Sequence, residues 1–552
     1  MSASETSQGS LDDARRLLDA GESLLDPALE AAVSLTDGGK AIDDHQVVAE
    51  RVVYAATEAR AAREVLALAD GAAAEGRSTP MLEATAIAAV ADLVTRLRDR
   101  LDPILDQLGL GDEALAAAFP PAVQSRLRAA GNEAALRAIG RDAIERRGRT
   151  EPPLDEMIEQ VRDSVREFAE NEIVPHAEHI HRGDLDIPES FIEKMGELGY
   201  FGLSIPEEYG GHEMGNLAMI LTTEELSRAS LAAAGSLITR PEILTKALMA
   251  GGTEEQKHAW LPKLATGEVM VGVAVTEPDI GSNVAGVKCR ATRATVGGEE
   301  GWVINGPKAW CTFAGRANVL ALLARTDVDT PGAKGLSLFI VPKEPFPGHE
   351  FETTQPGGGR LVGKADATPG YRGMHSFTLN FEDYFVPGEN LVGREEGLGR
   401  GFYLQMGGFA AGRLQTGGRG CGLAQAALEE TARYVVDRDQ FAGPIAEFQL
   451  TQYTLGCMAA RLLAARAITY AAAAAMDEDE RAAAPLAAQA KLLACDIAVD
   501  VSQQGQLMHG GWGYAEEYPI SRYVVDASVL PIFEGVKPIL ELYAIGRSLL
   551  AR

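Results

Sequence analysis

Paired cysteines are missing from this chain of 552 residues. Its five cysteines are odd in number and scattered along the sequence, and no two of them form a Cys-X-X-Cys motif. We therefore expect neither a disulfide framework nor a structural metal site, and we expect a reducing compartment such as the cytoplasm. The first residues also lack the apolar run of a secretory signal and include early acidic residues, so neither a signal nor a transit peptide is expected.

Positive charge and long apolar runs are also scarce. The formal net charge of −28 argues against nucleic acids and anionic membrane surfaces as partners. An anionic small ligand remains possible, because it needs only local positive charge. The longest apolar run, residues 462–476, is rich in alanine and contains Arg466, so no membrane insertion is expected.

The first 150 residues are dominated by alanine, arginine and leucine, without β-branched runs. Leucines recur every three or four residues and form one apolar stripe, which predicts an amphipathic helix kinked at Pro103 (Leu93, Leu97, Leu101, Leu105 and Leu108). We expect three to five helices here. No constellation of catalytic residue types occurs, so a packing or oligomerisation module is favoured over a second active site.

The rest of the chain alternates between two patterns. Helical periodicity over residues 154–171, 219–227 and 231–251 gives way to short apolar runs and glycine or proline turns over residues 271–392. Residues 357–373 are rich in glycine and are interpreted as a loop. Four long helices are expected at the end, over residues 402–437, 447–476, 485–509 and 528–550. Three nearby histidines are interpreted as part of a solvated loop rather than as a metal site (His176, His179 and His181).

Three short motifs follow one another along the chain. Residues 274–282 read AVTEPDIGS, residues 305–312 read NGPKAWCT, and residues 531–535 read PIFEG. In the first, an apolar run ends in a turn with hydroxyls and exposed N–H groups, which can hold a polar ring edge or a phosphate. Together the motifs resemble the flavin-binding β-domain and the catalytic-glutamate motif of the acyl-CoA dehydrogenase family. The resemblance spans residues 151–552.

This resemblance implies an α+β fold that is mostly α. The expected domains are a helical N-terminal extension (residues 1–150), an N-terminal α-domain (151–270), a middle β-domain (271–395) and a C-terminal four-helix bundle (396–552). The family removes two hydrogens from the Cα–Cβ bond of an acyl-CoA, with FAD as cofactor. A base must take the α-proton, an acceptor must take a hydride from Cβ, and donors must hold the thioester oxygen.

Glu534 matches the base of the family, and by resemblance its backbone N–H and a flavin ribityl hydroxyl are the donors to the thioester oxygen. The apolar residues before it predict a poorly solvated pocket. Some members of the family carry the base just before an arginine of the bundle instead. Here that arginine corresponds to Arg413 and Gly412 precedes it, so Glu534 is the only base that a motif supports.

The resemblance also implies the contacts with FAD. Val275 and Thr276 would meet the pyrimidine edge of the flavin, Trp310 would flank the ring, and Thr312 would hydrogen-bond near N5. The alternative for Trp310 is a role as a core aromatic. A turn further on would lie by the pyrophosphate or the bound thioester (Gly281 and Ser282).

Arg438 and Phe441 resemble a family segment that reaches the FAD of a neighbouring subunit. Three more residues match the segment near the adenosine (Gln506, Gly510 and Gly511). Two departures weaken these assignments. The family usually has Gly-Lys after the phenylalanine, where this chain has Ala442 and Gly443, and it has Thr or Ser where this chain has Val536.

The substrate is expected to be a short, branched acyl-CoA, with Ser282, Gly535 and Arg413 close to it. Arg240 lies in a segment that resembles the helix at the far end of the acyl pocket. A buried arginine needs an anion, so a carboxylate on the acyl group is one reading, and an ion pair with Glu242 is the other. Arg372 is a rival anchor for such a carboxylate.

The helical extension and the chain length are similar to family members that convert (2S)-methylsuccinyl-CoA to mesaconyl-CoA in the ethylmalonyl-CoA pathway. The alternatives are another short- or branched-chain acyl-CoA dehydrogenase, an acyl-CoA oxidase, and a catalytically silent binding protein. The expected partners are the acyl-CoA, an electron-transferring flavoprotein and a second copy of the chain in a homodimer.

Overall fold

The structure of this protein is a computed structural model, which describes residues 9–441 and 443–551. The chain forms two compact units. The first contains the residues up to Val161 and those from Thr416 onward, and the second is Arg162–Gln415. Helix α7 (Glu156–Phe168) and helix α13 (Gly401–Asp437) each run across one of the two divisions. The four expected domains therefore remain a prediction about sequence ranges.

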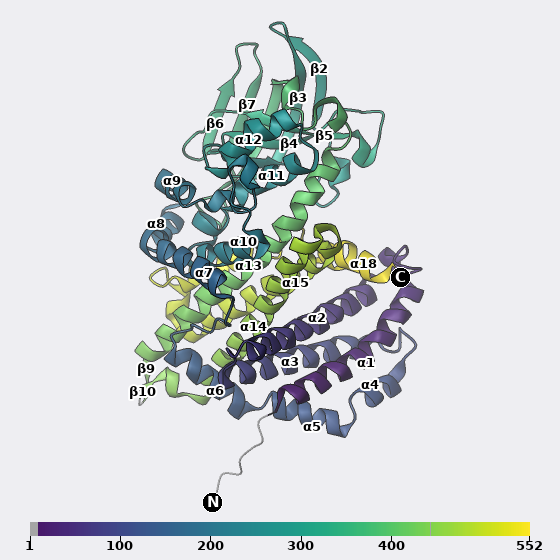
Figure 1. Cartoon of the computed structure of the whole chain (residues 1–552), viewed down its shortest axis with the longest axis vertical. Coiled ribbons are helices and arrows are strands. Elements are labelled where there is room, and N and C mark those ends of the chain that lie inside the picture. The colour runs from purple at the N-terminus through teal and green to yellow at the C-terminus, as the bar shows by residue number, and fades with distance from the viewer. Residues whose placement is uncertain (1–8, 442, 552) are drawn as a thin grey trace, which may run out of the picture. The chain divides into compact units, whose positions relative to one another are not determined.

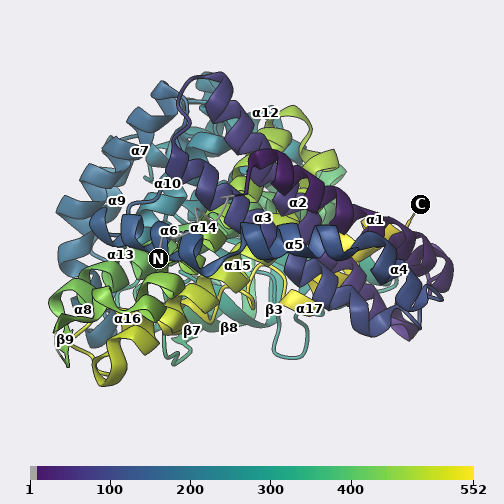
Figure 2. The same cartoon turned by 90° about the horizontal axis from the view of Figure 1, so that it is seen from below.

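The N-terminal extension folds into helices throughout its described residues (Figures 1 and 2). Ser10 caps the first helix in a reciprocal capping box with Asp13, and Thr79 and Asn132 cap α3 and α6. The helices are α1 (Leu11–Leu35), α2 (Gln46–Ala74), α3 (Pro80–Leu101), α4 (Gly111–Ala118), α5 (Pro121–Ala130) and α6 (Glu133–Glu145). There are more of them than the three to five expected.

The leucine stripe of this extension is buried along its whole length. The expected kink at Pro103 is wrong, because helix α3 ends at Leu101 and a 3₁₀ turn follows over Asp102–Ile104. Proline lacks the N–H that a continuing helix would require, so the chain stops there rather than bending.

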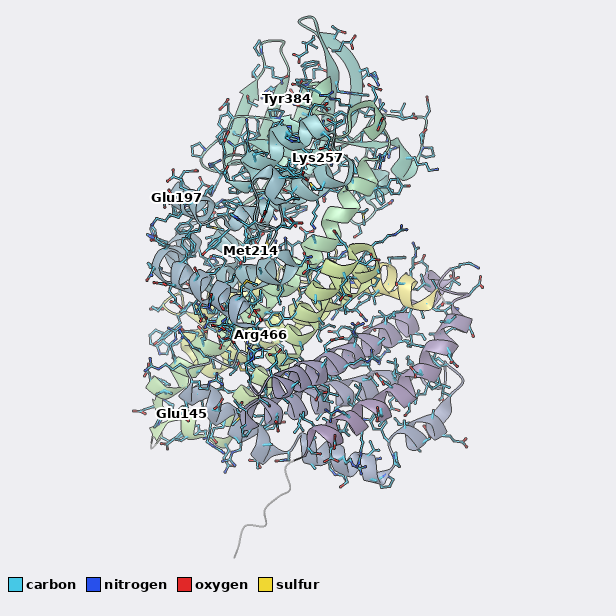
Figure 3. The ribbon with its side chains drawn as sticks, in the orientation of Figure 1. Glu145, Glu197, Met214, Lys257, Tyr384 and Arg466 are labelled. Carbon is cyan, nitrogen blue, oxygen red and sulfur yellow. The ribbon has the colours of Figure 1, made fainter. Side chains whose placement is uncertain are left out.

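The C-terminal part of the first unit packs its long helices against this extension (Figures 1 and 2). Helix α14 (Gln449–Glu478) contacts α2, α3 and α6 as well as α15 (Glu480–His509). Arg466 of α14, labelled in Figure 3, is fully buried, and its Nη2 donates to Oε1 of Gln425 at 2.9 Å. Helices α14 and α15 are long and apolar enough to cross a membrane, but 78% and 72% of those windows are buried inside the protein.

The crossing of α6 and α14 depends on two glycines. A Cβ placed on Gly140 would lie 1.7 Å from the carbonyl oxygen of Gln452, and one placed on Gly456 would lie 1.9 Å from that of Leu136. The two backbones therefore touch, which fixes the extension tightly on α14.

Two of the expected C-terminal helices differ from the structure. Helix α15 starts at Glu480 rather than at Pro485, because the Asp479 side chain accepts hydrogen bonds from two backbone N–H groups of the first turn. The expected helix over residues 528–550 is wrong. Helix α16 (Ile520–Ala527) ends just before this region, which contains a loop, α17 (Lys537–Ile539), a π-helical segment (Leu540–Gly546) and α18 (Arg547–Leu550).

The second unit places helices beside a β-sheet (Figure 1). Its remaining helices are α8 (Val174–Gly183), α9 (Glu189–Glu197), α10 (Gly215–Ala229), α11 (Thr239–Gly251) and α12 (Glu254–Ala265). Leucines of α11 and α12 share one hydrophobic core with the buried strands of the sheet (Leu244, Leu248, Leu261, Leu264, Val319 and Ile340).

The main sheet has eight strands in the order β1-β4-β2-β3-β8-β7-β6, with β5 paired to β4. The strands are β1 (Val271–Ala274), β2 (Arg290–Val296), β3 (Glu299–Thr312), β4 (Val319–Arg325), β5 (Leu336–Pro342), β6 (Glu350–Thr354), β7 (Arg360–Ala365) and β8 (Ser376–Pro387). Two further short strands, β9 (Asp439–Gln440) and β10 (Gly443–Pro444), form a hairpin in the first unit. The glycine-rich residues 357–373, interpreted as a loop, contain β7, which pairs with both β6 and β8.

The close crossing at Gly140 predicts a stability effect. Gly140→Ala should destabilise the protein by about 1–3 kcal/mol, because the new methyl group would overlap a backbone carbonyl of α14. Gly71 in α2 is the matched control, since nothing lies within 4 Å of a Cβ there, and Gly71→Ala should stabilise by about 0.5–1 kcal/mol. Urea unfolding of the full chain measures both; equal shifts in the two variants would contradict the tight crossing.

Candidate active site

Glu534 lies in the loop between α16 and α17, in a backbone conformation that residues with a Cβ rarely adopt. Its φ is 54°, and the φ of Gly535 is 100°. Such a conformation costs about 1–3 kcal/mol and persists only where its surroundings hold it. Here the fully buried Lys491 of α15 donates from Nζ to the carbonyl oxygen of Gly535 at 2.5 Å, and the Arg419 guanidinium lies 5.4 Å from the ring centre of Phe533.

The carboxylate of Glu534 has an oxygen with no protein partner. Oε2 is buried and accepts no hydrogen bond from any residue that the structure describes. Within that same part of the chain, the backbone N–H of Glu534 also donates to no protein acceptor. A buried polar atom without a partner is costly, so one at this position indicates a group that a ligand satisfies.

In the second unit, the turn after β1 is fixed by a buried ion pair. Lys308 is fully buried on β3, and its Nζ donates to Oε1 of Glu277 at 3.0 Å and to the carbonyl oxygen of Val275 at 2.9 Å. The Glu277 carboxylate also accepts from the backbone N–H groups of Lys288 and Cys289. Three segments of the sheet are thereby joined at one charge pair.

This ion pair brings four of the predicted flavin contacts together. Val275 and Thr276 follow β1, and the carbonyl oxygen of Thr276 accepts from Ala309 N at 2.9 Å, directly before Trp310 of β3. Trp310 has a φ of 56° and its side chain is 60% exposed, so the interpretation of Trp310 as a core aromatic is wrong. The hydroxyl of Thr312 forms a hydrogen bond of 3.1 Å with the hydroxyl of Ser376 on strand β8, which pairs with β3.

Gly281 and Ser282 lie just beyond this cluster, after the turn in which Glu277 and Ile280 bond each other's backbones. Both are exposed. Two buried thiols, by contrast, are shielded from chemistry at this edge. Burial raises the pKa of the Cys289 thiol to about 11, and it also raises the pKa of Cys311. Neither is poised to act as a nucleophile.

The first unit contains a pocket of about 610 Å³ around the C-terminal end of α15. Three of the predicted cofactor contacts, Arg438, Gly510 and Gly511, line it together with aromatic side chains (Tyr434, His509 and Trp512). A guanidinium, glycine backbones and flat rings suit a ligand with a phosphate and a base.

Two further predicted contacts lie beside this pocket rather than among its lining residues. Gln506 donates from Nε2 to the carbonyl oxygen of Gly513 at 3.0 Å. Phe441 has a φ of 59° and is 99% exposed, while Ala442 after it lies outside the described residues. Val536, the departure beside the base, is half-buried directly before α17.

The arginines proposed for the substrate differ in their surroundings. Arg240 of α11 is 3% exposed and donates only to neutral oxygens, to the Ser236 carbonyl from Nε at 3.1 Å and to the Thr239 hydroxyl from Nη2 at 3.2 Å. It forms no ion pair with any carboxylate in residues 9–441 and 443–551. Glu242, the suggested partner, instead hydrogen-bonds Ser204 and faces Lys246 at 4.0 Å, so that pairing is wrong.

Arg372, the rival anchor, is already occupied. Its Nε lies 3.4 Å from Oδ1 of Asp184 and donates to the Thr368 carbonyl. Arg413 is half-buried on α13.

The three histidines expected in a loop lie on helix α8 instead. A different cluster contains the imidazoles of His349 and His375, whose ring centres are 4.2 Å apart, together with Asp184. Burial acts to lower the pKa of His375, but its hydrogen bonds to Asp186 and Asp184 outweigh burial and the pKa is raised. With Arg372 beside Asp184, we interpret the cluster as a set of ion pairs between the residue that ends α8 and the segments before β6 and β8.

Three sequence comparisons decide the family. The models of the acyl-CoA dehydrogenase N-terminal, middle and C-terminal domains match residues 155–268, 272–384 and 399–550. The chain belongs to the acyl-CoA dehydrogenase family. It is therefore an oxidoreductase that acts on an acyl-CoA, as the three motifs predicted.

One curated relative matches almost the whole chain. The (2S)-methylsuccinyl-CoA dehydrogenase of Cereibacter sphaeroides is 37% identical over 524 residues, which cover 93% of each protein. Among solved structures, a glutaryl-coenzyme A dehydrogenase in complex with glutaryl-CoA is 31% identical, with a TM-score of 0.65, and covers 72% of this chain and 97% of its own. A glutaryl-CoA dehydrogenase of Mycobacterium smegmatis in complex with FADH2 is 25% identical, with a TM-score of 0.63, and covers 72% and 96%.

Acyl-CoA dehydrogenases depend on FAD, and the residues of this chain fit that cofactor. The exposed indole of Trp310 offers an apolar face beside Thr276 and Thr312 for a flat ring. The pocket at Arg438 offers a cation and aromatic rings for a pyrophosphate and an adenosine. The residue-by-residue roles stay predictions.

The sequence did not reveal several residues that support this site. Lys308 lies inside the recognised NGPKAWCT motif, but its burial and its pairing with Glu277 were not expected. Lys491 lies on a helix with no motif around it. The aromatic residues of the pocket could have been noticed, because Tyr434 and Trp512 lie within a few residues of predicted cofactor contacts.

Proposed function

We propose that this protein oxidises (2S)-methylsuccinyl-CoA to mesaconyl-CoA in the ethylmalonyl-CoA pathway of the cytoplasm and passes the electrons to an electron-transferring flavoprotein. The observation that carries the chemistry is the buried, unpartnered carboxylate oxygen of Glu534. The observation that carries the substrate class is Arg240, a buried cation without a carboxylate partner. The relative that matches the extension as well as the family domains supports the same substrate.

The chain's own residues account for the proton transfer. The free Oε2 of Glu534 would take the α-proton, and the backbone N–H of Glu534 would donate to the thioester oxygen as it gains negative charge. Because one residue supplies both groups, the unusual φ of Glu534 sets their directions together. Bound FAD supplies the acceptor for the hydride that leaves Cβ.

Position 412 offers no alternative base. The residue before Arg413 is Gly412, which has no side chain. Glu534 therefore remains the candidate that both the motif and the geometry support.

Arg240 supports an acyl group with its own carboxylate. Burying a guanidinium without an anion is expensive, and the neutral oxygens of Ser236 and Thr239 satisfy its hydrogen bonds but not its charge. A carboxylate at the far end of the acyl chain would supply that charge in a bidentate pair. Methylsuccinyl-CoA has such a carboxylate, whereas an unsubstituted branched acyl-CoA does not.

An acyl-CoA oxidase is the alternative, since it shares the base and the flavin and differs in giving its electrons to O₂. Rapid O₂ uptake with methylsuccinyl-CoA, matching reduction of an artificial electron acceptor, would favour it. A slow O₂ rate beside a fast acceptor rate supports the dehydrogenase.

Glu534→Gln tests the base. The substitution is nearly isosteric, so the fold and the bound FAD should be retained, while flavin reduction by substrate should slow by about 10²–10⁴-fold. The matched control is Glu113→Gln, because Glu113 is exposed and lies on α4, far in the sequence from the loop. Rapid anaerobic bleaching of the flavin in Glu534→Gln would remove Glu534 from the mechanism.

Arg240→Leu tests the carboxylate. It should weaken binding or turnover of methylsuccinyl-CoA by about 2–5 kcal/mol, as expected when one partner of a buried charge pair is removed. The loss should be far smaller with isobutyryl-CoA, which has no carboxylate. Arg372→Leu is the control, because Arg372 already pairs with Asp184. Equal losses on both substrates would show that Arg240 is structural.

We also propose a homodimer in which each subunit contributes Arg438 and Phe441 to the FAD of its partner. A phenylalanine that is 99% exposed beside a pocket with a guanidinium supports this, since a partner surface that covered the ring would gain the burial of its apolar area. The extension helices cover α14 and leave less of the bundle for a further interface. Light scattering should give twice the chain mass of 58.6 kDa, and a stable tetramer would contradict the proposal.

A further inference from the structure

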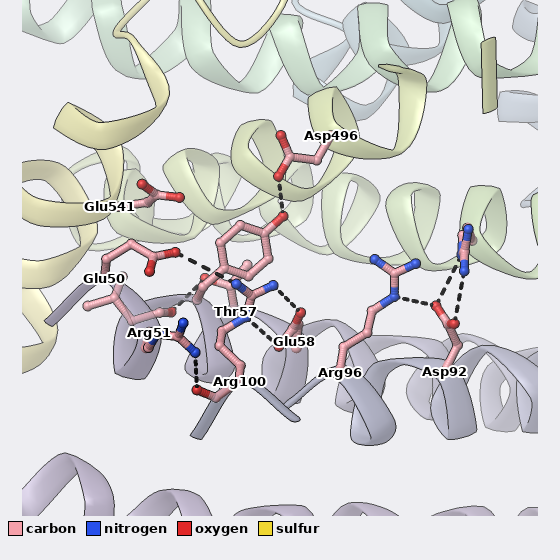
Figure 4. A network of polar contacts seen from close by, with 12 residues as sticks. Glu50, Arg51, Thr57, Glu58, Asp92, Arg96, Arg100, Asp496 and Glu541 are labelled. Atoms are coloured by element: carbon pink, nitrogen blue, oxygen red, sulfur yellow. Dashed lines mark hydrogen bonds and ion pairs between the residues drawn. The ribbon is translucent and has the colours of Figure 1, made fainter. Parts of the chain in front are cut away.

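A hydrogen bond from Tyr54 links the extension to helix α15, which holds the loop that carries Glu534. Tyr54 of α2 is 4% exposed, and its Oη donates to Oδ2 of Asp496 on α15 at 2.5 Å. Figure 4 shows Asp496 receiving this bond from the side of the extension helices. A buried tyrosine hydroxyl normally takes such a partner, so this bond alone does not distinguish Tyr54 from any core residue.

The same carboxylate oxygen also holds the loop. Nζ of Lys537 lies 2.6 Å from Oδ2 of Asp496, and it lies 5.1 Å from the centre of the Tyr54 ring. Lys537 follows Glu534 by three residues, and its backbone N–H donates to the Pro531 carbonyl at 2.9 Å, which closes the loop around Glu534. Tyr54 and Lys537 therefore bind the same oxygen of Asp496, and the position of that carboxylate affects both side chains.

Helix α15 fixes the loop at two points. Asp496 holds Lys537 after Glu534, and Lys491 holds the carbonyl of Gly535. The positive φ of Glu534 makes these anchors necessary, because the residue would otherwise relax toward an allowed conformation and turn its carboxylate and its N–H away. A shift of about 1 Å in a reacting group is enough to cost roughly 10²-fold in rate.

Tyr54 is itself held in place. The guanidinium of Arg100 lies 3.9 Å from the centre of its ring, and Arg100 is fixed by an ion pair of 2.9 Å with Glu58, which is buried (Figure 4). Three residues further along α2, Thr57 accepts a hydrogen bond of 3.3 Å from Gln489 of α15. The hydroxyl of Tyr54 thus has a defined position relative to α15.

We propose that Tyr54 of the N-terminal extension is a positioning residue for Glu534, acting through Asp496 and Lys537. This inference rests on the proposed role of Glu534 as the base. It gives the extension a part in the reaction: the extension holds the carboxylate that anchors the catalytic loop. When the hydroxyl is removed, Asp496 keeps only Lys537, and the pair gains freedom to move with the loop.

The experiment uses the full-length, FAD-loaded protein with Tyr54→Phe, Lys537→Gln and the double variant. Tyr54→Phe should lower kcat and the rate of flavin reduction by about 3–10-fold while KM changes less than about twofold, because binding contacts are untouched. The kinetic isotope effect with α-deuterated substrate should rise, since proton abstraction becomes slower relative to the other steps. The double variant should be no slower than Lys537→Gln alone, because both substitutions break the same link.

Tyr543→Phe is the matched control. Tyr543 also donates from its hydroxyl to an aspartate, Asp43, and so also joins the extension to the C-terminal segment, but within the described residues it forms no hydrogen bond with Lys537 or Asp496. Its kcat and isotope effect should stay at the wild-type values. Asp496→Asn tests the same link from α15 and should reproduce the loss if Tyr54→Phe does not fold.

The outcomes separate this inference from the proposed function. Wild-type kcat in Tyr54→Phe, an equal loss in Tyr543→Phe, or losses that multiply in the double variant would overturn the role of Tyr54 while Glu534→Gln remains inactive. Full activity of Glu534→Gln would overturn the proposed function, and this inference with it.

Discussion

Two fully buried lysines hold the two turns on which the proposed active site depends. Lys491 donates to the carbonyl of Gly535, next to Glu534, and Lys308 donates to the carbonyl of Val275, next to Thr276. In both places an ammonium group in the interior fixes backbone that would otherwise be free to relax. The two buried charges thus fix the backbone at the predicted functional positions.

The extension and the family domains differ in what they provide to the proposed site. The family motifs contain the proposed base and the predicted flavin contacts. The extension contains no catalytic motif, yet it lies against α14 and α15, and α15 carries both anchors of the Glu534 loop. An added module can therefore influence the chemistry by holding the helix behind the active residue, without contributing a group to the site itself.

Much of the fold could be predicted because local sequence patterns, such as apolar runs and helical periodicity, determine it. The apolar runs that became β4 and β5 and the long periodic helix α13 are where the sequence indicated. The expected helix over residues 528–550 was wrong because apolar residues at helical spacing hid the effect of Pro531 and Gly535. Strand β7 was missed because three glycines directly precede it and Gly363 lies within it, so that the composition of the whole stretch is typical of a loop.

The site could be predicted only where a motif carried it. Glu534 and Trp310 stand in recognisable motifs, but the ion pair of Lys308 with Glu277 joins positions 31 residues apart and has no local signal. The pairing of Arg240 failed for a simple geometric reason: residues two apart on a helix face different directions, so Glu242 meets Ser204 instead.

The pairing of Lys308 with Glu277 has an evolutionary consequence. Replacing either residue alone would strand a charge in the interior, at a cost of about 3–5 kcal/mol, whereas replacing both with well-packed apolar residues can be nearly neutral. Evolution from the ion pair to an apolar pair therefore requires either a poorly stable single mutant or two simultaneous substitutions. The two positions are bound to be inherited as one unit, although one lies in the TEPDIGS turn and the other in the NGPKAW strand.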